Sequence, residues 1–206
     1  MRPYSRSYTI AAVDTDGIVD GGTGASLTLL ATSSGDGLAH QLNFTSAQNI
    51  SDHTFTVVGT DENGAAQTEV VTGPNATTVE STKYFLTYES ITPDATLDAD
   101  TVDIGWVDEF VTPTYACNRY ADAMMIETDI SGTINYSVQQ TLIPMTEGSA
   151  NLAWVDVGAG IADSVDVTAI TVDAQFSMNP PPSGIRVVAH SYSTGATLAL
   201  RATHNG

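Results

Sequence analysis

The stretch "FTVVGTDENGAAQTEVVTG", residues 55–73, contains two extended runs joined by an acidic loop, residues 61–64. Both runs are rich in Val and Thr, residues that favour β-strands. In the loop, the Asn63-Gly64 pair tolerates a positive φ, and the Asp61 side chain can bond to its own backbone across the turn. The stretch therefore predicts a β-hairpin whose acidic loop closes a sheet and is not a catalytic or metal-binding device.

The same alternation of apolar and polar residues recurs along the chain. In "TVDIGW", residues 101–106, Val102, Ile104 and Trp106 fall on one face of a strand. Further strands are predicted at residues 7–13, 25–32, 38–44, 83–91, 133–142, 151–157, 164–172, 184–191 and 196–202. Turn signals separate these runs, among them "DTDG" (14–17), "SGDG" (34–37) and "NPPPSG" (179–184). Short strands with turns about every ten residues indicate an all-β sandwich or barrel.

Two segments leave the local structure open. Residues 119–128, "RYADAMMIET", suit a helix or a strand. In residues 164–172 the alternation changes phase between Val167 and Ile170, which predicts a β-bulge.

The chain of 206 residues is long enough for one large all-β domain or two smaller ones. A boundary is expected near Pro113, because the strand that contains Trp106 ends before it and Pro cannot donate to a central ladder. We therefore expect two antiparallel β-sandwich domains, residues 1–112 and residues 113–206. One continuous sandwich is the alternative.

The net charge of −18, with 24 acidic and six basic residues, restricts the partners. So few cations cannot neutralise a row of phosphates, so we expect no nucleic acid. Anionic membranes would repel the chain, so we expect no membrane partner. The N-terminal residues have no long apolar core, which predicts a soluble protein without a secretory signal.

The residues that carry common chemistries do not fall into known motifs. The histidines (His40, His53, His190 and His204) lack metal-ligand spacing, and no Gly-x-Ser-x-Gly or Walker motif occurs. Cys117 is the single cysteine, so no intrachain disulfide is expected, and a semi-buried thiol is favoured over a reactive one. We expect no catalytic residues, no cofactor and no enzymatic activity.

Calcium is the one ligand that the acidic loops suggest. Asp14 and Asp16 in "DTDG" resemble the start of an EF-hand loop, but Ile18 and Ala25 stand where that loop needs an oxygen ligand and a bidentate acid. Asp14 and Asp16 are therefore weak candidates for a looser calcium site. Solvated turn residues are the alternative.

Two blocks of the chain resemble a known class of proteins: residues 57–95, and a closing block that begins at residue 130 and ends at residue 203. "VVGTDENGAAQTEVVTGPNATTVESTKYFLTYESITPDA" (57–95), "ISGTINYSVQQTL" (130–142) and "GIRVVAHSYSTGATLALRAT" (184–203) resemble segments of small β-rich structural proteins of tailed bacteriophages. Trp154 would match the aromatic segment that often lies between the two parts of the closing block. The resemblance covers about half of the chain and brings no catalytic motif. It implies a virion component present in many copies that contacts other virion proteins, with a homo-oligomer expected.

Within that class we expect a capsid decoration (cement) protein, with a head-to-tail or tail-fibre adaptor as the alternative. A carbohydrate-binding or adhesin module is a further alternative, which would need a row of exposed aromatic side chains. The candidates for such a row are Tyr84, Tyr88, Tyr120, Tyr136 and Tyr192. Arg2 and Arg6 make the N-terminal segment basic, so it is either an arm that docks on an acidic neighbour or a frayed terminus.

Overall fold

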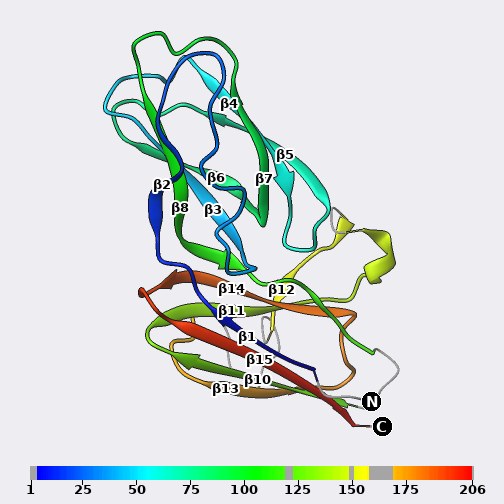
Figure 1. Ribbon diagram of the computed structural model, residues 1–206. Helices are drawn as coiled ribbons and strands as arrows, with labels where there is room; N and C mark the ends of the chain where they lie inside the picture. The colour runs from blue at the N-terminus through cyan, green and yellow to red at the C-terminus, as the bar shows by residue number, and fades with distance from the viewer. Residues whose placement is uncertain (1–3, 119–122, 149–150, 158–168, 206) are drawn as a thin grey trace. The chain divides into compact units, whose positions relative to one another are not determined.

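The computed structural model describes residues 4–118, 123–148, 151–157 and 169–205 (Figure 1). The fold is all-β and its strand pairs are antiparallel, as the sequence predicted. Within these ranges there is no α-helix, and η1 (Met145–Glu147) is a short 3₁₀ turn. No helix of the described chain is long and apolar enough to cross a membrane.

The chain forms two compact units. Unit 2 consists of residues 12–110, and unit 1 combines residues 1–11 with residues 111–206. The junction at residues 110/111 falls next to the boundary expected at 112/113. The first eleven residues differ from the expectation, since they belong with the C-terminal part of the chain. The reason is a strand pairing between the two ends of the chain, which alternation within a strand does not reveal.

Unit 2 has two antiparallel sheets that enclose an apolar core. The strands of the first sheet are β2 (Asp14–Gly22), β8 (Val102–Val111), β3 (Ala39–Thr45) and β6 (Thr78–Phe85). The second sheet has the order β5 (Ala66–Thr72), β4 (Thr54–Thr60) and β7 (Thr87–Pro93). Phe44 of the first sheet and Phe55 of the second are fully buried, and their ring centroids lie 5.4 Å apart. Aromatic contact between the sheets is therefore central to this core.

Unit 1 also has antiparallel sheets on either side of a core. One sheet has the order β1 (Tyr4–Thr9), β15 (Thr197–Asn205), β10 (Ala123–Ser131) and β13 (Ala174–Met178). The other contains β12 (Val155–Asp156), β11 (Ile134–Thr141) and β14 (Gly184–Tyr192), with β9 (Tyr115–Ala116) paired to β14. In Figure 1 the blue strand β1 lies beside the red strand β15, so the two ends of the chain meet in one sheet.

The hairpin at residues 55–73 forms as predicted. β4 and β5 pair in a continuous register from Thr54↔Thr72 to Thr60↔Ala66. The Asp61 carboxylate accepts hydrogen bonds from the backbone N–H groups of Asn63 (2.9 Å) and Ala65 (2.8 Å). Gly64 has φ +80°, a conformation that favours glycine. The acidic loop therefore holds the turn closed.

Two sequence predictions in unit 2 were wrong. Residues 25–32 are not a strand: Leu27 and Leu29 alternate because they pack on the core from an irregular loop, and one backbone bond, Leu30 N–H to Ile18 O (2.8 Å), ties it to β2. Residues 14–17 are not a turn but the start of β2. Here the backbone of β2 passes so close to Gly105 that a side chain there would collide with the carbonyl of Asp14.

Other predicted segments differ in extent. Residues 83–91 divide at Leu86 between β6 and β7, and in residues 151–157 the strand is limited to Val155–Asp156. The open segment 119–128 is strand β10 from Ala123 onward, and residues 119–122 lie outside the described chain. The bulge predicted between Val167 and Ile170 also falls largely outside it, although Ile170 forms a bridge with Tyr136.

A carboxylate links two sheet edges in unit 2. β5 and β6 end their respective sheets, and Glu69 of β5 accepts hydrogen bonds from the backbone N–H groups of Thr82 (2.7 Å) and Lys83 (2.9 Å) on β6. In return, the Lys83 ammonium donates to the backbone carbonyl of Thr68 (2.7 Å). Side chains thus satisfy backbone groups that no neighbouring strand pairs.

Candidate functional site

The outer face of the β1-β15-β10-β13 sheet is the candidate contact surface of unit 1. Its residues follow from the strand registers, and we call it the polar sheet face: Ser5, Ser7, Thr9, Met125, Glu127, Asp129, Ser131, Gln175, Ser177, Thr197, Ala199, Arg201 and Thr203. Hydroxyl, amide and charged side chains dominate it. Met125 is its exposed large apolar residue.

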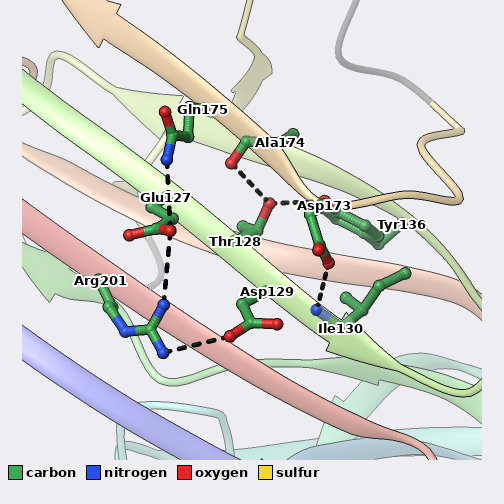
Figure 2. A network of polar contacts seen from close by, with 9 residues as sticks. All are labelled: Glu127, Thr128, Asp129, Ile130, Tyr136, Asp173, Ala174, Gln175 and Arg201. Atoms are coloured by element: carbon green, nitrogen blue, oxygen red, sulfur yellow. Dashed lines mark hydrogen bonds and ion pairs between the residues drawn. The ribbon is translucent and has the colours of Figure 1, made fainter.

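Arg201 forms ion pairs with two acidic residues of this face (Figure 2). Its guanidinium lies 3.5 Å from the Glu127 carboxylate, directly across the β10–β15 ladder, and 3.2 Å from the Asp129 carboxylate. On the other side, the Gln175 amide donates to Glu127 (3.3 Å). The three charged side chains are 39–50% exposed, so the pairs add little stability. They bring two carboxylates and one guanidinium together on a sheet surface.

Beneath this face, a buried polar contact joins the two sheets of unit 1. Thr128 of β10 and Tyr136 of β11 share a hydrogen bond of 2.5 Å, and the Tyr136 hydroxyl donates to the backbone carbonyl of Val172 (2.9 Å). Burial raises the pKa of Tyr136, so its hydroxyl stays protonated and available as a donor. Asp173 accepts from the N–H of Ile130 (2.8 Å), which fixes the approach to β13. Figure 2 shows the contacts of Thr128 with Tyr136 and Ala174, and that of Ile130 with Asp173.

The basic N-terminal segment is a strand where the structure describes it. Arg6 lies in β1, and its guanidinium stands over the ring of Tyr8 at 5.2 Å from the centroid. Arg2 lies outside the described residues. Arg6 points to the same side of β1 as the buried Tyr8, the side away from the polar sheet face.

Asp14 and Asp16 lie on strand β2, two residues apart. The backbone N–H of Asp16 approaches the Asp14 carboxylate at 3.4 Å. A side-chain hydrogen bond with Asp14, together with the negative charges of Asp14 and Asp20, raises the pKa of Asp16. Among the described residues, no group of three or more His, Cys, Asp or Glu side chains could hold a metal ion. The calcium hypothesis gains no third ligand and stays a prediction.

His40 belongs to a buried structural cluster. The ring is fully buried beside Phe110, and its Nε2 lies 2.9 Å from the carboxylate of Asp36. Asp36 also accepts from the Ser34 hydroxyl (2.7 Å) and the Leu38 N–H (3.0 Å). Because Ser34 bonds to the acid and not to the imidazole, this cluster lacks the order of a catalytic triad. Its geometry fastens the loop before β3.

His53 and His190 also have side-chain partners. His53 pairs with Asp94 at 3.2 Å, and hydrogen bonds from the Thr54 backbone and from His53 lower the pKa of Asp94. His190 Nε2 lies 2.8 Å from the hydroxyl of Ser137, a pair that sequence reasoning missed because the two residues come from strands 53 positions apart. Ser137 is buried, although His190 is exposed, so the pair resembles a nucleophile and base only in distance. The side chain of His204 lies outside the described part.

Cys117 and the candidate tyrosines that the structure describes are buried or half-buried. Burial raises the pKa of the Cys117 thiol to about 12, so the reactive thiolate is scarce at neutral pH. Tyr88, Tyr136 and Tyr192 are buried, and Tyr84 is half-buried with its hydroxyl on Glu109 (3.0 Å). Tyr120 lies outside the described residues. The candidate tyrosines that the structure describes therefore do not form the exposed row that stacking on sugars needs.

Trp154 has a different environment from the tyrosines. The guanidinium of Arg186 lies 4.2 Å from the Trp154 ring centroid, and Arg186 Nε donates to Gln139 (2.9 Å). Gln139 in turn donates to Asp156 (3.2 Å). This stack joins the loop before β12 to β11 and β14.

Comparisons with known proteins give no family for the chain. No family model matches, and no curated protein matches. Among solved structures, a structure of the Gx strain of infectious bursal disease virus is similar over 100% of this chain and 71% of that one, with 13% identity and a TM-score of 0.23. A structure of the Gt strain is similar over 98% and 70%, with 11% identity and a TM-score of 0.22. This is a weak similarity to viral structures, and at such TM-scores it carries no argument about the chain.

Proposed function

We propose that the chain is a non-enzymatic structural component of a tailed-phage virion, and that it acts as a capsid decoration (cement) protein through protein–protein contacts. The class comes from the resemblance of residues 57–95, 130–142 and 184–203 to phage structural proteins. The first block folds into β4, β5, β6 and β7, where its acidic groups Asp61 and Glu69 serve the backbone. These contacts make a scaffold and support a structural role.

The observation that carries the proposal is the polar sheet face. Glu127 and Asp129 are half-exposed, and both lie within ion-pair distance of Arg201. A surface of paired charges and small hydroxyls suits docking on a complementary protein surface, where charge pattern sets orientation and specificity. The excess of acid over base on this face favours a basic partner surface.

Capsid binding tests the proposal. Purified protein is mixed with assembled capsids that lack it, sedimented, and the capsids are then heated. Decoration predicts saturable co-sedimentation and a higher capsid melting temperature. Absence of both effects would overturn the decoration role.

A charge-reversal pair locates the contact. Asp129→Lys changes the exposed acid of the polar sheet face, and Asp52→Lys makes the same change on an exposed loop of unit 2. We expect Asp129→Lys to weaken capsid binding about tenfold, the size of a lost charge pair at an interface. Asp52→Lys should bind like the unmodified protein. Equal effects of the two would argue for non-specific charge attraction.

The adaptor role is the competing assignment within the same virion. An adaptor should form a closed ring or trimer with the symmetry of the neck or tail. Light scattering after gel filtration, at several protein and salt concentrations, measures this directly. A stable ring that fails to bind capsid shells would replace decoration by the adaptor role.

A further inference from the structure

Unit 1 is built from two separate parts of the chain. Residues 111–206 supply all its described strands except β1, and residues 12–110 of unit 2 separate β1 from those strands in the sequence. β1 is an edge strand whose one strand partner is β15. Its removal would leave the order β15-β10-β13 unbroken. β1 is thus an edge strand added to a sheet whose other strands all come from residues 111–206.

The pairing of β1 is nevertheless specific. Its register runs from Tyr4↔Ala202 to Thr9↔Thr197, and the backbone bond from Ile10 N–H to Ala196 O (3.0 Å) extends it. Tyr8 is 4% exposed opposite the fully buried Leu198, and Ile10 is 3% exposed. Without β1, the edge of β15 and the apolar side chains next to it would face water. The free edge therefore has both a hydrogen-bonding register and an apolar contact to offer a strand.

We propose that β1 is exchanged between copies, so that β1 of one molecule completes the unit 1 sheet of a second. The contacts of β1 with β15 are the same whichever copy supplies the strand. The choice between the two arrangements depends on the effective concentration of the strand and on the linker, residues 11–13, where Val13 is 44% exposed. The effective concentration of a tethered segment is about 1 mM. A second copy present at about this concentration therefore competes equally with the chain's own β1 for the edge of β15. This inference rests on the proposed function, because a virion component is present at such density.

The composition of β1 also favours a second copy as the partner. Residues 4–9, "YSRSYT", contain Arg6 and no acid, in a chain with a net charge of −18. The acceptor strand β15 contains no acid either, and the nearby carboxylates Glu127 and Asp129 are on β10. The exchanged pair therefore places no carboxylate of β1 against a carboxylate of β15, which limits repulsion between two acidic molecules at this contact.

Disulfide trapping in the full chain tests the exchange. In a Cys117→Ser background, Ser7→Cys is placed in one chain and Ala199→Cys in another, since these residues are directly opposite in the ladder. Opposite residues in a ladder have Cβ atoms about 4.5–5.5 Å apart, a separation that a disulfide accepts with a small backbone adjustment. The two chains are mixed, oxidised and separated on a non-reducing gel. Exchange predicts a disulfide-linked heterodimer whose fraction rises about tenfold for a tenfold rise in concentration below about 1 mM.

A matched control replaces Ala199→Cys by Ser177→Cys. Ser177 is exposed on β13, at the opposite edge of the same sheet, so it reports random collisions. A heterodimer yield no higher than in this control, with an intrachain disulfide in the Ser7→Cys/Ala199→Cys double variant at every concentration, would overturn the exchange. Failure of the double variant to form any disulfide would overturn the pairing itself.

A second cysteine pair guards against a variant that does not fold. Thr9→Cys and Thr197→Cys are also opposite in the register and lie at the end of β1 near the linker. The assay contains no capsid, so its failure leaves capsid binding unaffected. Loss of capsid binding with intact cross-linking would instead refute the virion role and keep the exchange.

Discussion

The β4–β5 hairpin and the β1–β15 pair are both regular antiparallel ladders, yet they are closed in different ways. Residues 61–65 close the hairpin, and Asp61 and Gly64 there specify the turn. No local turn closes the β1–β15 ladder, because all of unit 2 and most of unit 1 separate the two strands in the sequence. A strand in a hairpin pairs with its neighbour in the same chain. A strand whose partner is distant in the sequence can pair with that partner in its own chain or in a neighbouring copy. The difference separates a scaffold element from an exchangeable one.

The largest effect should come from the core behind the hairpin. Phe55→Ala removes a fully buried ring of β4 that packs on Phe44, and should lower the free energy of unfolding by about 3–5 kcal/mol. Denaturant titration and amide exchange of β4 measure the loss. Val70→Ala, at a side chain 61% exposed on β5, is the control and should change stability by less than about 0.5 kcal/mol. A small loss for Phe55→Ala would refute the packing of the two sheets.

The corresponding change on β1 should be smaller. Tyr8→Ala exposes the apolar contact with Leu198 and should cost about 2 kcal/mol, the value of burying one large side chain. Amides of β15 should then exchange faster, while those of β4 should not. Thr9→Ala, at an exposed position of the same strand, is the control. Unchanged exchange in β15 would mean that Tyr8 does not hold β1 in place.

The turn comes next in size. Asp61→Ala removes two hydrogen bonds to the backbone at an exposed loop, and should lower stability by about 1 kcal/mol. Gly64→Ala should cost about 1–2 kcal/mol because φ is +80° there. Neither change touches β1, so neither should alter strand exchange. An effect of either on disulfide trapping would contradict the separation of the two ladders.

The pH dependence should be weaker still. Hydrogen bonds from Thr54 and His53 lower the folded-state pKa of Asp94, so its contribution is complete above the unfolded value of about 4 and is lost as the pH falls through the folded pKa. Asp94→Asn should therefore flatten the acid side of the stability curve. Urea unfolding between about pH 2 and pH 5 measures the slope. A variant curve parallel to that of the unmodified protein would show no contribution from Asp94.

Chelation should have the least effect. Calcium takes about six to eight oxygen ligands, and among the described residues no group of three or more acidic, His or Cys side chains could hold a metal ion. We expect EDTA to leave the melting temperature unchanged, measured by circular dichroism with and without added calcium. A lower melting temperature in EDTA would restore the calcium site.

Alternation in the sequence predicted the fold class and the hairpin because both depend on local chemistry. Alternation placed Val102 and Ile104 on a buried face, and turn chemistry placed Asp61 and Gly64 in the turn. Alternation was wrong at residues 25–32, since Leu27 and Leu29 alternate toward a core without strand pairing. The turn signal was wrong at residues 14–17, where the backbone packs closely against Gly105 and is extended.

The candidate site was less accessible to sequence reasoning. The period-2 pattern puts Glu127 and Asp129 on one face of a strand, but it does not name Arg201 as their partner. Ser137 and His190 meet for the same kind of reason, through the pairing of β11 with β14. Contacts between distant strands depend on topology, which residue periodicity does not encode.

The link between Glu69 and β6 has a consequence for aggregation. Sheet edges with unsatisfied N–H groups recruit strands from other molecules and so start fibres, a hazard that grows with protein density. Because Glu69 already accepts from Thr82 and Lys83, an incoming strand must first displace a carboxylate that makes two backbone bonds. At the edge of β5, the Lys83 ammonium donates to the backbone carbonyl of Thr68, which an incoming strand would also have to displace. These contacts therefore oppose the addition of strands from other molecules, and so polymerisation, at the edges of β5 and β6.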